Sequence, residues 1–87
     1  MKIIHIVNSF GKNIFIEDKQ VGYIDRNGLF INGHKFADIT EDGEISLGDK
    51  HVGYVDENGY IIINDAEVGY IDLDNNFVFY KTTVFNR

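Results

Sequence analysis

The sequence predicts an all-β fold built from short hairpins, and three observations support that prediction. The first is composition: among 87 residues, Ile, Val and Thr number 13, 7 and 3 and Phe and Tyr add 12, whereas Ala, Leu, Met and Gln together number 7. Residues that are aromatic or branched at Cβ favour strands, and the good helix formers are scarce. The other two observations are an internal repeat and a regular series of turns.

The repeat extends over nearly the whole chain. The run Val21-Gly22-Tyr23-Ile24-Asp25-Arg26-Asn27-Gly28 returns at residues 52–59 and, over its first five positions, at residues 68–72. Weaker copies occupy residues 36–43 and 6–11. The turn position is filled by Gly11, Gly28, Gly43, Gly59 and Asn75, at intervals of 17, 15, 16 and 16 residues. Such a fixed period predicts an array of similar units.

Each unit is predicted to run strand, turn, strand, turn. In Asp56-Glu57-Asn58-Gly59 the first side chain can accept hydrogen bonds from the backbone ahead of it, and glycine suits the left-handed conformation that closes the turn. A second, tighter turn follows, of which Asn32-Gly33 is the clearest example. The predicted units cover residues 2–17, 18–32, 33–48, 49–64 and 65–81, followed by a strand at residues 82–86. Together they make one domain, residues 1–87, with about ten strands.

Alternation of side chains predicts how the strands are arranged. It puts Val52 and Tyr54 on one face of their strand and Gly53 and Val55 on the other, so both faces are apolar. An antiparallel meander that closes into a small barrel or folds into two layers would bury both. The alternative is a parallel β-solenoid, but turns of the form Asp-x-Asn-Gly favour antiparallel hairpins. Residues 37–47 alternate strictly between apolar and polar, which predicts one solvated face.

The ends of such an array also need partners. The apolar segments at residues 3–7, 78–80 and 82–85 would otherwise expose strand edges. We expect these segments either to pair with each other and close the sheet or to form a homodimer or partner interface by strand addition.

The segments at residues 21–28 and 52–59 resemble the short WG-type repeats of bacteria, in which a Gly-Tyr-Ile-Asp strand precedes a turn that ends in glycine. The resemblance covers about five sixths of the chain, but the characteristic Trp is absent, with Val21, Val52 and Val68 near its place. The resemblance implies a binding or scaffolding array and supplies no catalytic residues.

Composition also excludes several classes of function. The chain has no Cys, which excludes a disulfide framework, a Cys-based zinc site and a cysteine nucleophile. No apolar stretch is long enough for a signal peptide or membrane span, so the sequence predicts a soluble, cytoplasmic protein. A net charge of −6 opposes direct binding to nucleic acid or to an anionic membrane.

Catalytic and metal-binding patterns are weak throughout, and the sequence predicts a protein that is not an enzyme and needs no metal or cofactor. The three histidines, His5, His34 and His51, are too widely spaced for the usual zinc motifs. The run at residues 72–76 opens like a calcium loop but lacks the glycine and glutamate that such a loop needs further on. The aspartates that begin successive turns, Asp25, Asp56 and Asp72, are predicted to be structural rather than a glycosidase pair.

Two groups of residues are the candidates for binding. Residues 1–43 carry a net charge of −1 and residues 44–87 carry −5, and the predicted partner-binding residues are therefore Asp56, Glu57, Asp65, Glu67, Asp72 and Asp74. The second group is a predicted aromatic ladder of Tyr23, Tyr54 and Tyr70. The leading hypothesis is a non-enzymatic module that binds a basic protein, as an inhibitor or immunity protein would. The alternatives are a module that binds glycans or cell-surface ligands and a structural repeat without a ligand.

Overall fold

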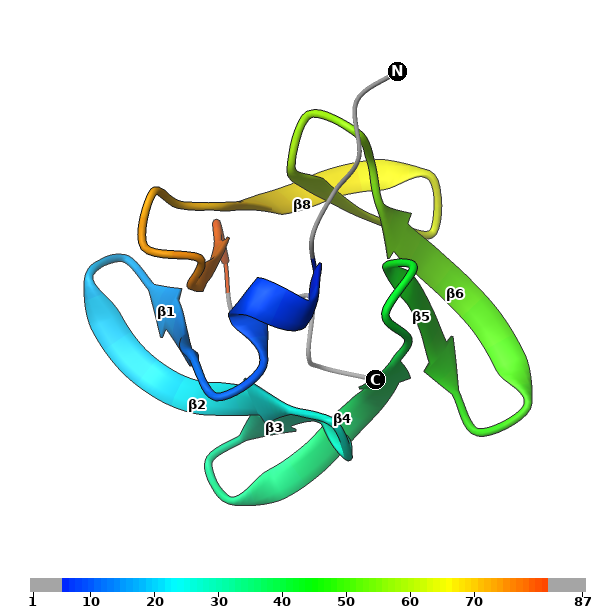
Figure 1. The fold of residues 1–87 in the computed structure, drawn as a ribbon, viewed down its shortest axis with the longest axis horizontal. Helices are drawn as coiled ribbons and strands as arrows, with labels where there is room; N and C mark the ends of the chain where they lie inside the picture. Colours follow the sequence, from blue (N-terminus) through cyan, green and yellow to red (C-terminus); the bar gives the residue numbers. More distant parts are fainter. Residues whose placement is uncertain (1–5, 82–87) are drawn as a thin grey trace.

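The computed structural model describes residues 6–81, which form a closed nine-stranded β-barrel preceded by one turn of 3₁₀ helix (Figure 1). The elements in chain order are η1 (Ile6–Ser9), β1 (Asn13–Ile16), β2 (Lys19–Asp25), β3 (Gly28–Ile31), β4 (His34–Ile39), β5 (Glu44–Leu47), β6 (Lys50–Val55), β7 (Tyr60–Ile63), β8 (Ala66–Ile71) and β9 (Phe77–Phe79).

Every strand from β1 to β9 pairs antiparallel with the next, so the meander of hairpins is confirmed and the solenoid alternative is wrong. The first unit departs from the prediction, because residues 6–9 form η1 where the repeat predicts a strand. That unit therefore contributes one strand instead of a hairpin, and the described residues hold nine strands rather than about ten. The strand predicted at residues 82–86 lies outside the described residues.

The loss of one strand determines how the barrel closes. In a meander of nine strands, the first and last strands run in the same direction, so they can pair only in parallel. β1 indeed pairs with β9 in parallel, with Ile14 opposite Phe77 and Ile16 opposite Phe79. Of the two alternatives predicted for the ends of the array, closure of the sheet is thus the one observed, with Asn13–Ile16 and Phe77–Phe79 as the closing strands. The second strand overlaps the predicted segment at residues 78–80, and residues 3–5 and 82–85 lie outside the described residues.

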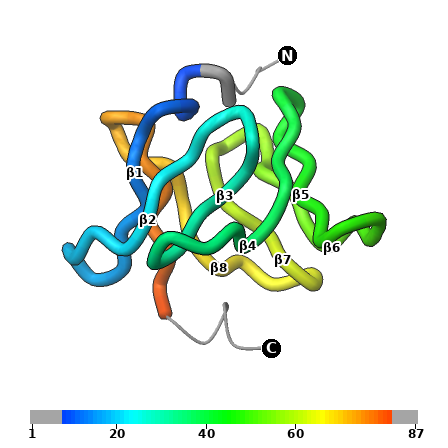
Figure 2. The backbone as a smooth tube through the Cα atoms, turned by 90° about the horizontal axis from the view of Figure 1, so that it is seen from below, coloured from blue at the N-terminus to red at the C-terminus, as the bar shows by residue number. Residues whose placement is uncertain are grey.

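Successive turns alternate between the two ends of the barrel (Figure 2). We call one the helix end: it carries η1 and the turns at residues 25–28, 40–43, 56–59 and 72–76. We call the other the far end: it carries the turns at residues 17–18, 32–33, 48–49 and 64–65. The N–H of Gly11 donates to the carbonyl oxygen of Ile24 at 2.6 Å, which ties the segment after η1 to the helix end.

The helix-end turns are closed by a repeated side-chain hydrogen bond. In the turn at residues 56–59, the N–H groups of Asn58 and Tyr60 donate to Oδ1 of Asp56 at 2.9 and 3.0 Å, and Gly59 has φ of 88°. Asp72 accepts from its own turn in the same way, and Thr40 accepts through its hydroxyl. These bonds supply the structural reason, expected from the sequence, for an oxygen-bearing side chain at the start of each turn.

The far-end turns are tight two-residue hairpins. Three of them place both central residues at positive φ, which is the geometry of a type I′ turn. Asn32-Gly33 confirms the hairpin predicted from sequence, and Asn64-Asp65 adopts the same conformation without glycine.

Each far-end hairpin also contains a β-bulge. The register shifts by one residue between the strands of all four hairpins, which leaves one extra residue on the second strand. The extra residues are Val21, Phe36, Val52 and Val68, and all four pack in or against the core. Bulges of this kind bend and twist a sheet, which helps a short meander to close into a barrel. The prediction that Val52 and Tyr54 share one face is wrong, because the bulge turns Val52 inward while Tyr54 stays outside.

The barrel interior is filled by aliphatic side chains and two phenylalanines. Phe77 and Phe79 of β9 are 0% and 1% exposed, and their ring centroids lie 6.3 Å apart in an edge-to-face arrangement. The aliphatic members of the core are Ile14, Ile16, Ile24, Leu29, Ala37, Ile39, Ile45, Val52, Val55, Ile61 and Ile63. Ala37, Ile39 and Ile45 are buried while Thr40 and Glu44 are exposed, which confirms the one-sided pattern predicted for residues 37–47.

One inward-facing position of the repeat is almost always glycine, and strand spacing explains why. A Cβ on Gly53 would lie 2.1 Å from the carbonyl oxygen of Ile62 on the neighbouring strand, and Gly22 and Gly69 are equally close to their neighbours. Ala37 occupies the equivalent position on β4. There the ladder with β5 has only two pairs, and it ends at Asp38 opposite Ser46, one pair before Ala37 would be reached. The strands thus separate where a Cβ is present.

Candidate functional site

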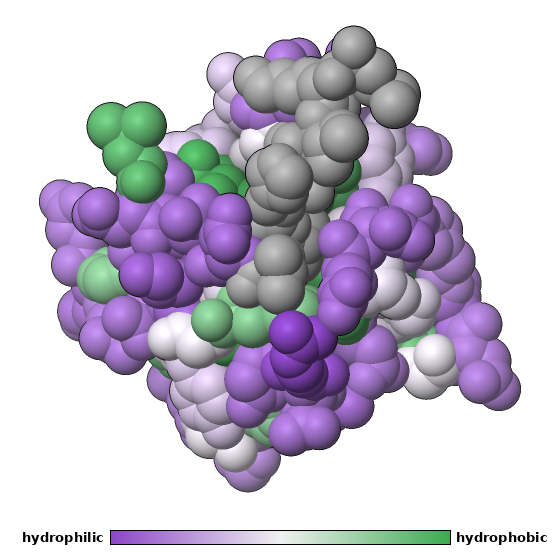
Figure 3. Space-filling model, in the orientation of Figure 1, coloured by the Kyte–Doolittle hydropathy of each residue, from purple (hydrophilic) through white to green (hydrophobic). Residues whose placement is uncertain are grey.

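The helix end of the barrel gathers most of the acidic residues that the turns carry. Its four turns hold seven carboxylates, whereas the described cations at this end are Arg26 and Lys12. Figure 3 looks onto this end and shows mainly hydrophilic residues around it. The seven carboxylates belong to Asp25, Glu41, Asp42, Asp56, Glu57, Asp72 and Asp74. The meander therefore gathers acidic residues at one end of the barrel. This is in addition to the difference in net charge between residues 1–43 and residues 44–87.

Six of these seven carboxylates fall into two groups by their contacts. Asp25, Asp56 and Asp72 each accept hydrogen bonds from the backbone of their own turn, so they help to hold the turn closed. The side chains of three others, Asp42, Glu57 and Asp74, are exposed, and their carboxylates have no hydrogen bond or ion pair with any residue of the described chain. They lie on three successive helix-end turns, where their charges face solvent. The helix end thus presents carboxylates that the fold does not use.

Arg26 is held by two contacts within the helix end. Its Nη1 lies 2.7 Å from Oε2 of Glu41 on the next helix-end turn, and its guanidinium carbon lies 5.0 Å from the ring centroid of Phe10. Both charged side chains are well exposed, so the ion pair contributes little to stability. It does neutralise Glu41, which leaves the free negative charge on the side of the helix end formed by the turns at residues 40–43, 56–59 and 72–76.

The six predicted partner-binding residues do not lie together. Asp56, Glu57, Asp72 and Asp74 are at the helix end, whereas Asp65 and Glu67 belong to the last far-end hairpin. The far-end segments at residues 17–20, 32–35, 48–51 and 64–67 carry five carboxylates but also three lysines. The two acidic edges expected from sequence therefore differ, and the helix end carries the larger excess of negative charge.

The three tyrosines of the predicted ladder all lie on the outer surface, but strands with other residues separate them. Tyr23 stacks on Phe30 of β3, with ring centroids 4.8 Å apart and planes 6° apart. Tyr54 on β6 lies opposite Ile62 of β7, and Tyr70 on β8 lies opposite Tyr60 of β7. The predicted row is therefore not a single stack of rings.

Two further tyrosines extend the aromatic surface on β7 to β9. Tyr60 and Tyr80 are 42% and 41% exposed, and the Tyr80 ring centroid lies 6.0 Å from that of Tyr70. Sequence reasoning missed them as part of this surface because they lie outside the repeated Val-Gly-Tyr run. The cross-strand position of Tyr60 opposite Tyr70 was the available signal, but it required the correct register.

Tyr80 donates its hydroxyl hydrogen to Oε2 of Glu67. That hydrogen bond, followed by desolvation and the charge of Glu67, raises the pKa of Tyr80 from 10.0 to about 12. A raised tyrosine pKa means that the folded state favours the protonated hydroxyl. The resulting stabilisation is present below pH 10 and is lost as the pH rises through about 12.

We expect the alkaline absorbance titration of the tyrosines to contain a step near pH 12 that belongs to Tyr80. In Tyr80→Phe this step should disappear, and in Glu67→Gln it should move to lower pH because the carboxylate no longer accepts the hydroxyl hydrogen. Circular dichroism at each pH separates titration of the folded state from unfolding. A high-pH step that stays unchanged in Glu67→Gln would contradict the assigned hydrogen bond.

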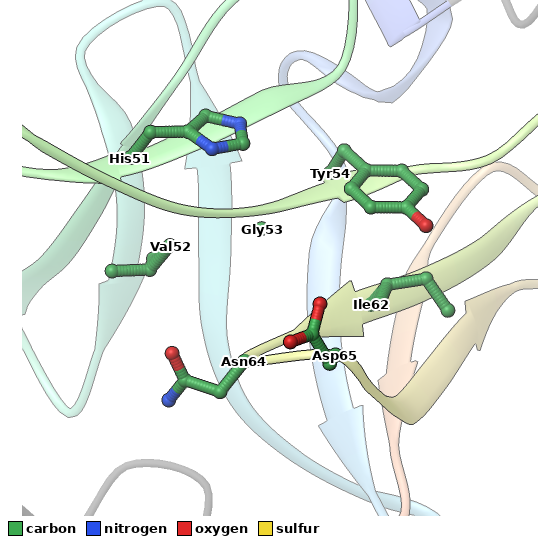
Figure 4. A pocket seen from close by; sticks show the side chains of 7 residues that line it. All are labelled: His51, Val52, Gly53, Tyr54, Ile62, Asn64 and Asp65. Atoms are coloured by element: carbon green, nitrogen blue, oxygen red, sulfur yellow. The ribbon is translucent and has the colours of Figure 1, made fainter.

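A groove of about 190 Å³ lies on the outer surface near the far end, between β6 and the segment that joins β7 to β8. Figure 4 shows His51 and Tyr54 along β6, Ile62 on β7, and the Asp65 carboxylate pointing from its turn toward β6. His51 Nε2 is 2.5 Å from Oε1 of Glu44 on β5. The remaining lining residues are Val52, Gly53 and Asn64.

Neither a cluster of metal ligands nor a membrane-spanning helix occurs within residues 6–81. Within residues 6–81, no three or more His, Asp or Glu side chains are grouped so that they could hold a metal ion. His34 and His51 lie on different strands, and His5 is outside the described residues. Over the same range, no helix has the length and apolar character needed to cross a membrane.

Comparison with known proteins adds no relative. Neither a protein-family model, nor a curated protein, nor a solved structure matches the chain, so its resemblance to WG-type repeats stays a prediction.

Proposed function

We propose that this barrel is a non-enzymatic binding module that uses its helix end to bind a basic protein. The observation that carries the proposal is the set of unpaired carboxylates on successive helix-end turns, at Asp42, Glu57 and Asp74. Charges that the fold does not use are free to attract a partner of opposite charge. Small acidic inhibitors and immunity proteins that block basic effectors work in this way, so we place the module in that functional class.

Leu73 strengthens this proposal. Its side chain is 101% exposed at the tip of the turn at residues 72–76, between Asp72 and Asp74. A leucine in that position contributes no burial to the barrel. It would gain burial if a partner covered the helix end, because removing its apolar surface from water is favourable. The helix end thus combines electrostatic attraction with one apolar contact.

The experiment compares capture of partners by two charge-neutralised proteins. The first variant combines Asp42→Asn, Glu57→Gln and Asp74→Asn, and the second combines Glu17→Gln, Asp18→Asn and Asp49→Asn at the far end. The two variants have the same net charge. We expect the helix-end variant to lose its basic partners from a native-host lysate at low salt, while the far-end variant retains most of the capture.

Salt and the Leu73→Ser variant provide two further readouts. Binding should weaken steeply as salt rises, because screening reduces steering between opposite charges. Leu73→Ser should weaken binding at constant salt without lowering the melting temperature. Equal losses in the two charge variants would indicate a non-specific effect of net charge and would contradict the proposed site. Binding of a neutral glycan in place of a basic protein would favour the alternative function.

A further inference from the structure

The groove near the far end occupies a position that recurs in every repeat, so the equivalent positions can be compared. Across β2, β4, β6 and β8, the position of His51 is taken by Gln20, Lys35, His51 and Glu67, and the position of Tyr54 is taken by Tyr23, Asp38, Tyr54 and Tyr70. The next strand provides the opposite wall in each case.

In three of the four repeats, contacts within the chain occupy these positions. One face of the Tyr23 ring stacks on Phe30, although Tyr23 as a whole is 42% exposed. Lys35 pairs with Asp38 at 2.5 Å, which links the two positions directly. At β8, the Tyr80 side chain contacts both Glu67 and Tyr70.

The repeat at β6 is different, and this difference leaves its groove open. Within residues 6–81, Tyr54 makes no ring-to-ring contact. Its exposure of 41% is close to the 42% of Tyr23 and the 37% of Tyr70, so the difference between the repeats lies in the neighbours of the ring. The cross-strand neighbour of Tyr54 is Ile62, whereas that of Tyr23 is Phe30. Asn64 follows β7 at the position that Tyr80 takes after β9. His51 turns away to Glu44 on β5. In two other repeats the tyrosine contacts another aromatic ring, and in the third Asp38 replaces it, so only the Tyr54 ring lacks such a contact among these four positions.

The charges around this ring determine which ligand it would suit. Asp65 lines the groove, is exposed, and has no hydrogen-bond or ion-pair partner among the described residues. Glu44 lies opposite Tyr54, and Glu67 lies opposite Ile62. An aromatic face beside an unpaired carboxylate favours a planar cation, because a guanidinium group can stack on the ring and donate two parallel hydrogen bonds to the carboxylate.

We infer that this groove binds an arginine side chain of a partner protein, with the guanidinium over Tyr54 and paired with Asp65. The inference rests on the proposed function, since it specifies the chemistry of one contact with a basic partner. It adds a second contact surface on the barrel wall, near the end opposite to the free carboxylates of the helix end. An arginine is favoured over lysine because only the planar guanidinium can make both interactions at once.

The test uses three capped tripeptides, acetyl-Gly-X-Gly-amide with X as arginine, lysine or citrulline, titrated into the ¹⁵N-labelled protein at low salt. Citrulline has nearly the same shape as arginine but no charge, and lysine has the charge without the planar group. We expect amide shifts at residues 51–54 and 62–65 with the arginine peptide. Binding of the lysine peptide should be at least about threefold weaker, and the citrulline peptide should cause no saturable shift.

Two variants and two matched controls locate the contact. Asp65→Asn should weaken arginine binding about tenfold through loss of the charge-assisted hydrogen bonds, and asparagine tolerates the positive φ of this turn. Tyr54→Leu should weaken it about threefold. Tyr23→Leu, the equivalent change in the first repeat, and Asp18→Asn, which removes a carboxylate from another far-end turn, should leave binding unchanged.

Several results would overturn the inference: no shifts with the arginine peptide, equal affinity for the three peptides, shifts centred on the helix end, or a neutral saccharide occupying the groove in place of arginine. Because the helix-end experiment changes neither Tyr54 nor Asp65, a failure here leaves the proposed function separately testable. Conversely, peptide binding in the groove together with full capture by the helix-end variant would support the groove alone.

Discussion

Replacing Gly53 with alanine is expected to destabilise the barrel by about 3 kcal/mol, although alanine is intrinsically the better residue in a strand by about 0.5 to 1 kcal/mol. The added Cβ would lie 2.1 Å from the carbonyl oxygen of Ile62 and 3.0 Å from the Cα of Ile63. Both atoms belong to the backbone, so a side-chain rotation cannot relieve the overlap. The strands must separate, and the hydrogen bonds between β6 and β7 lengthen or break.

The melting temperature measures this effect and should fall by roughly 10 to 20 °C for a domain of this size. Ala37→Gly is the matched control, because Ala37 occupies the equivalent position where the strands have already separated. It should change stability by less than about 1 kcal/mol. A Gly53→Ala protein as stable as the wild type would show that the strand spacing does not require glycine.

Truncation of Phe77 to alanine is expected to cost about 3 to 5 kcal/mol, a large part of the roughly 5 to 15 kcal/mol that stabilises a typical domain. Phe77 is fully buried and belongs to a strand of three residues. It lies opposite Ile71 on one side and Ile14 on the other. Loss of the ring therefore weakens both ladders that hold β9 in place, and with them the closure of the barrel.

Urea unfolding measures the loss of stability, and amide exchange shows where it acts. Protection of the amides in Asn13–Ile16 should fall more than protection in the hairpin of β5 and β6, because β1 depends on β9 for one of its two ladders. Val78→Ala, on the outer face of the same strand, should cost much less. If β1 keeps its wild-type protection in Phe77→Ala, then β9 does not hold the seam as described.

Much of the fold could be predicted from the sequence because each repeat contains the residues that specify its own turns. The run from Val21 to Gly28 and its copies predict strand, turn type and period together, and each has a local physical cause. Antiparallel pairing follows from turns too tight for a crossover. These are properties of neighbouring residues, which a single sequence contains directly.

What the sequence did not predict depends on contacts between distant residues. The bulge at Val52 reverses the alternation expected around it, and nothing in the local pattern distinguishes a bulged residue from a regular one. Replacement of the first strand by η1 changed the strand number from even to odd and therefore made the closure parallel. The aromatic surface that includes Tyr60 and Tyr80 was missed for the same reason, since it exists only in the final register.

The candidate site was predicted only in part. The acidic residues were identified, but their separation between the two barrel ends follows from the alternation of turns around the meander. The distinction between Asp56, which closes its own turn, and Glu57, which has no contact, required atomic positions. The groove beside Tyr54 could not be predicted, because it results from the absence of a side chain that the other repeats provide.

The parallel seam also has a mechanical consequence. β1 begins at the helix end and β9 finishes at the far end, so a force that pulls Asn13 and Phe79 apart acts along the two strands in opposite directions. Such a force loads the hydrogen bonds of the seam together in shear instead of opening them one after another, as it would at the end of a hairpin. The barrel is therefore built to resist tension along its axis, with rupture beginning at the seam between β1 and β9.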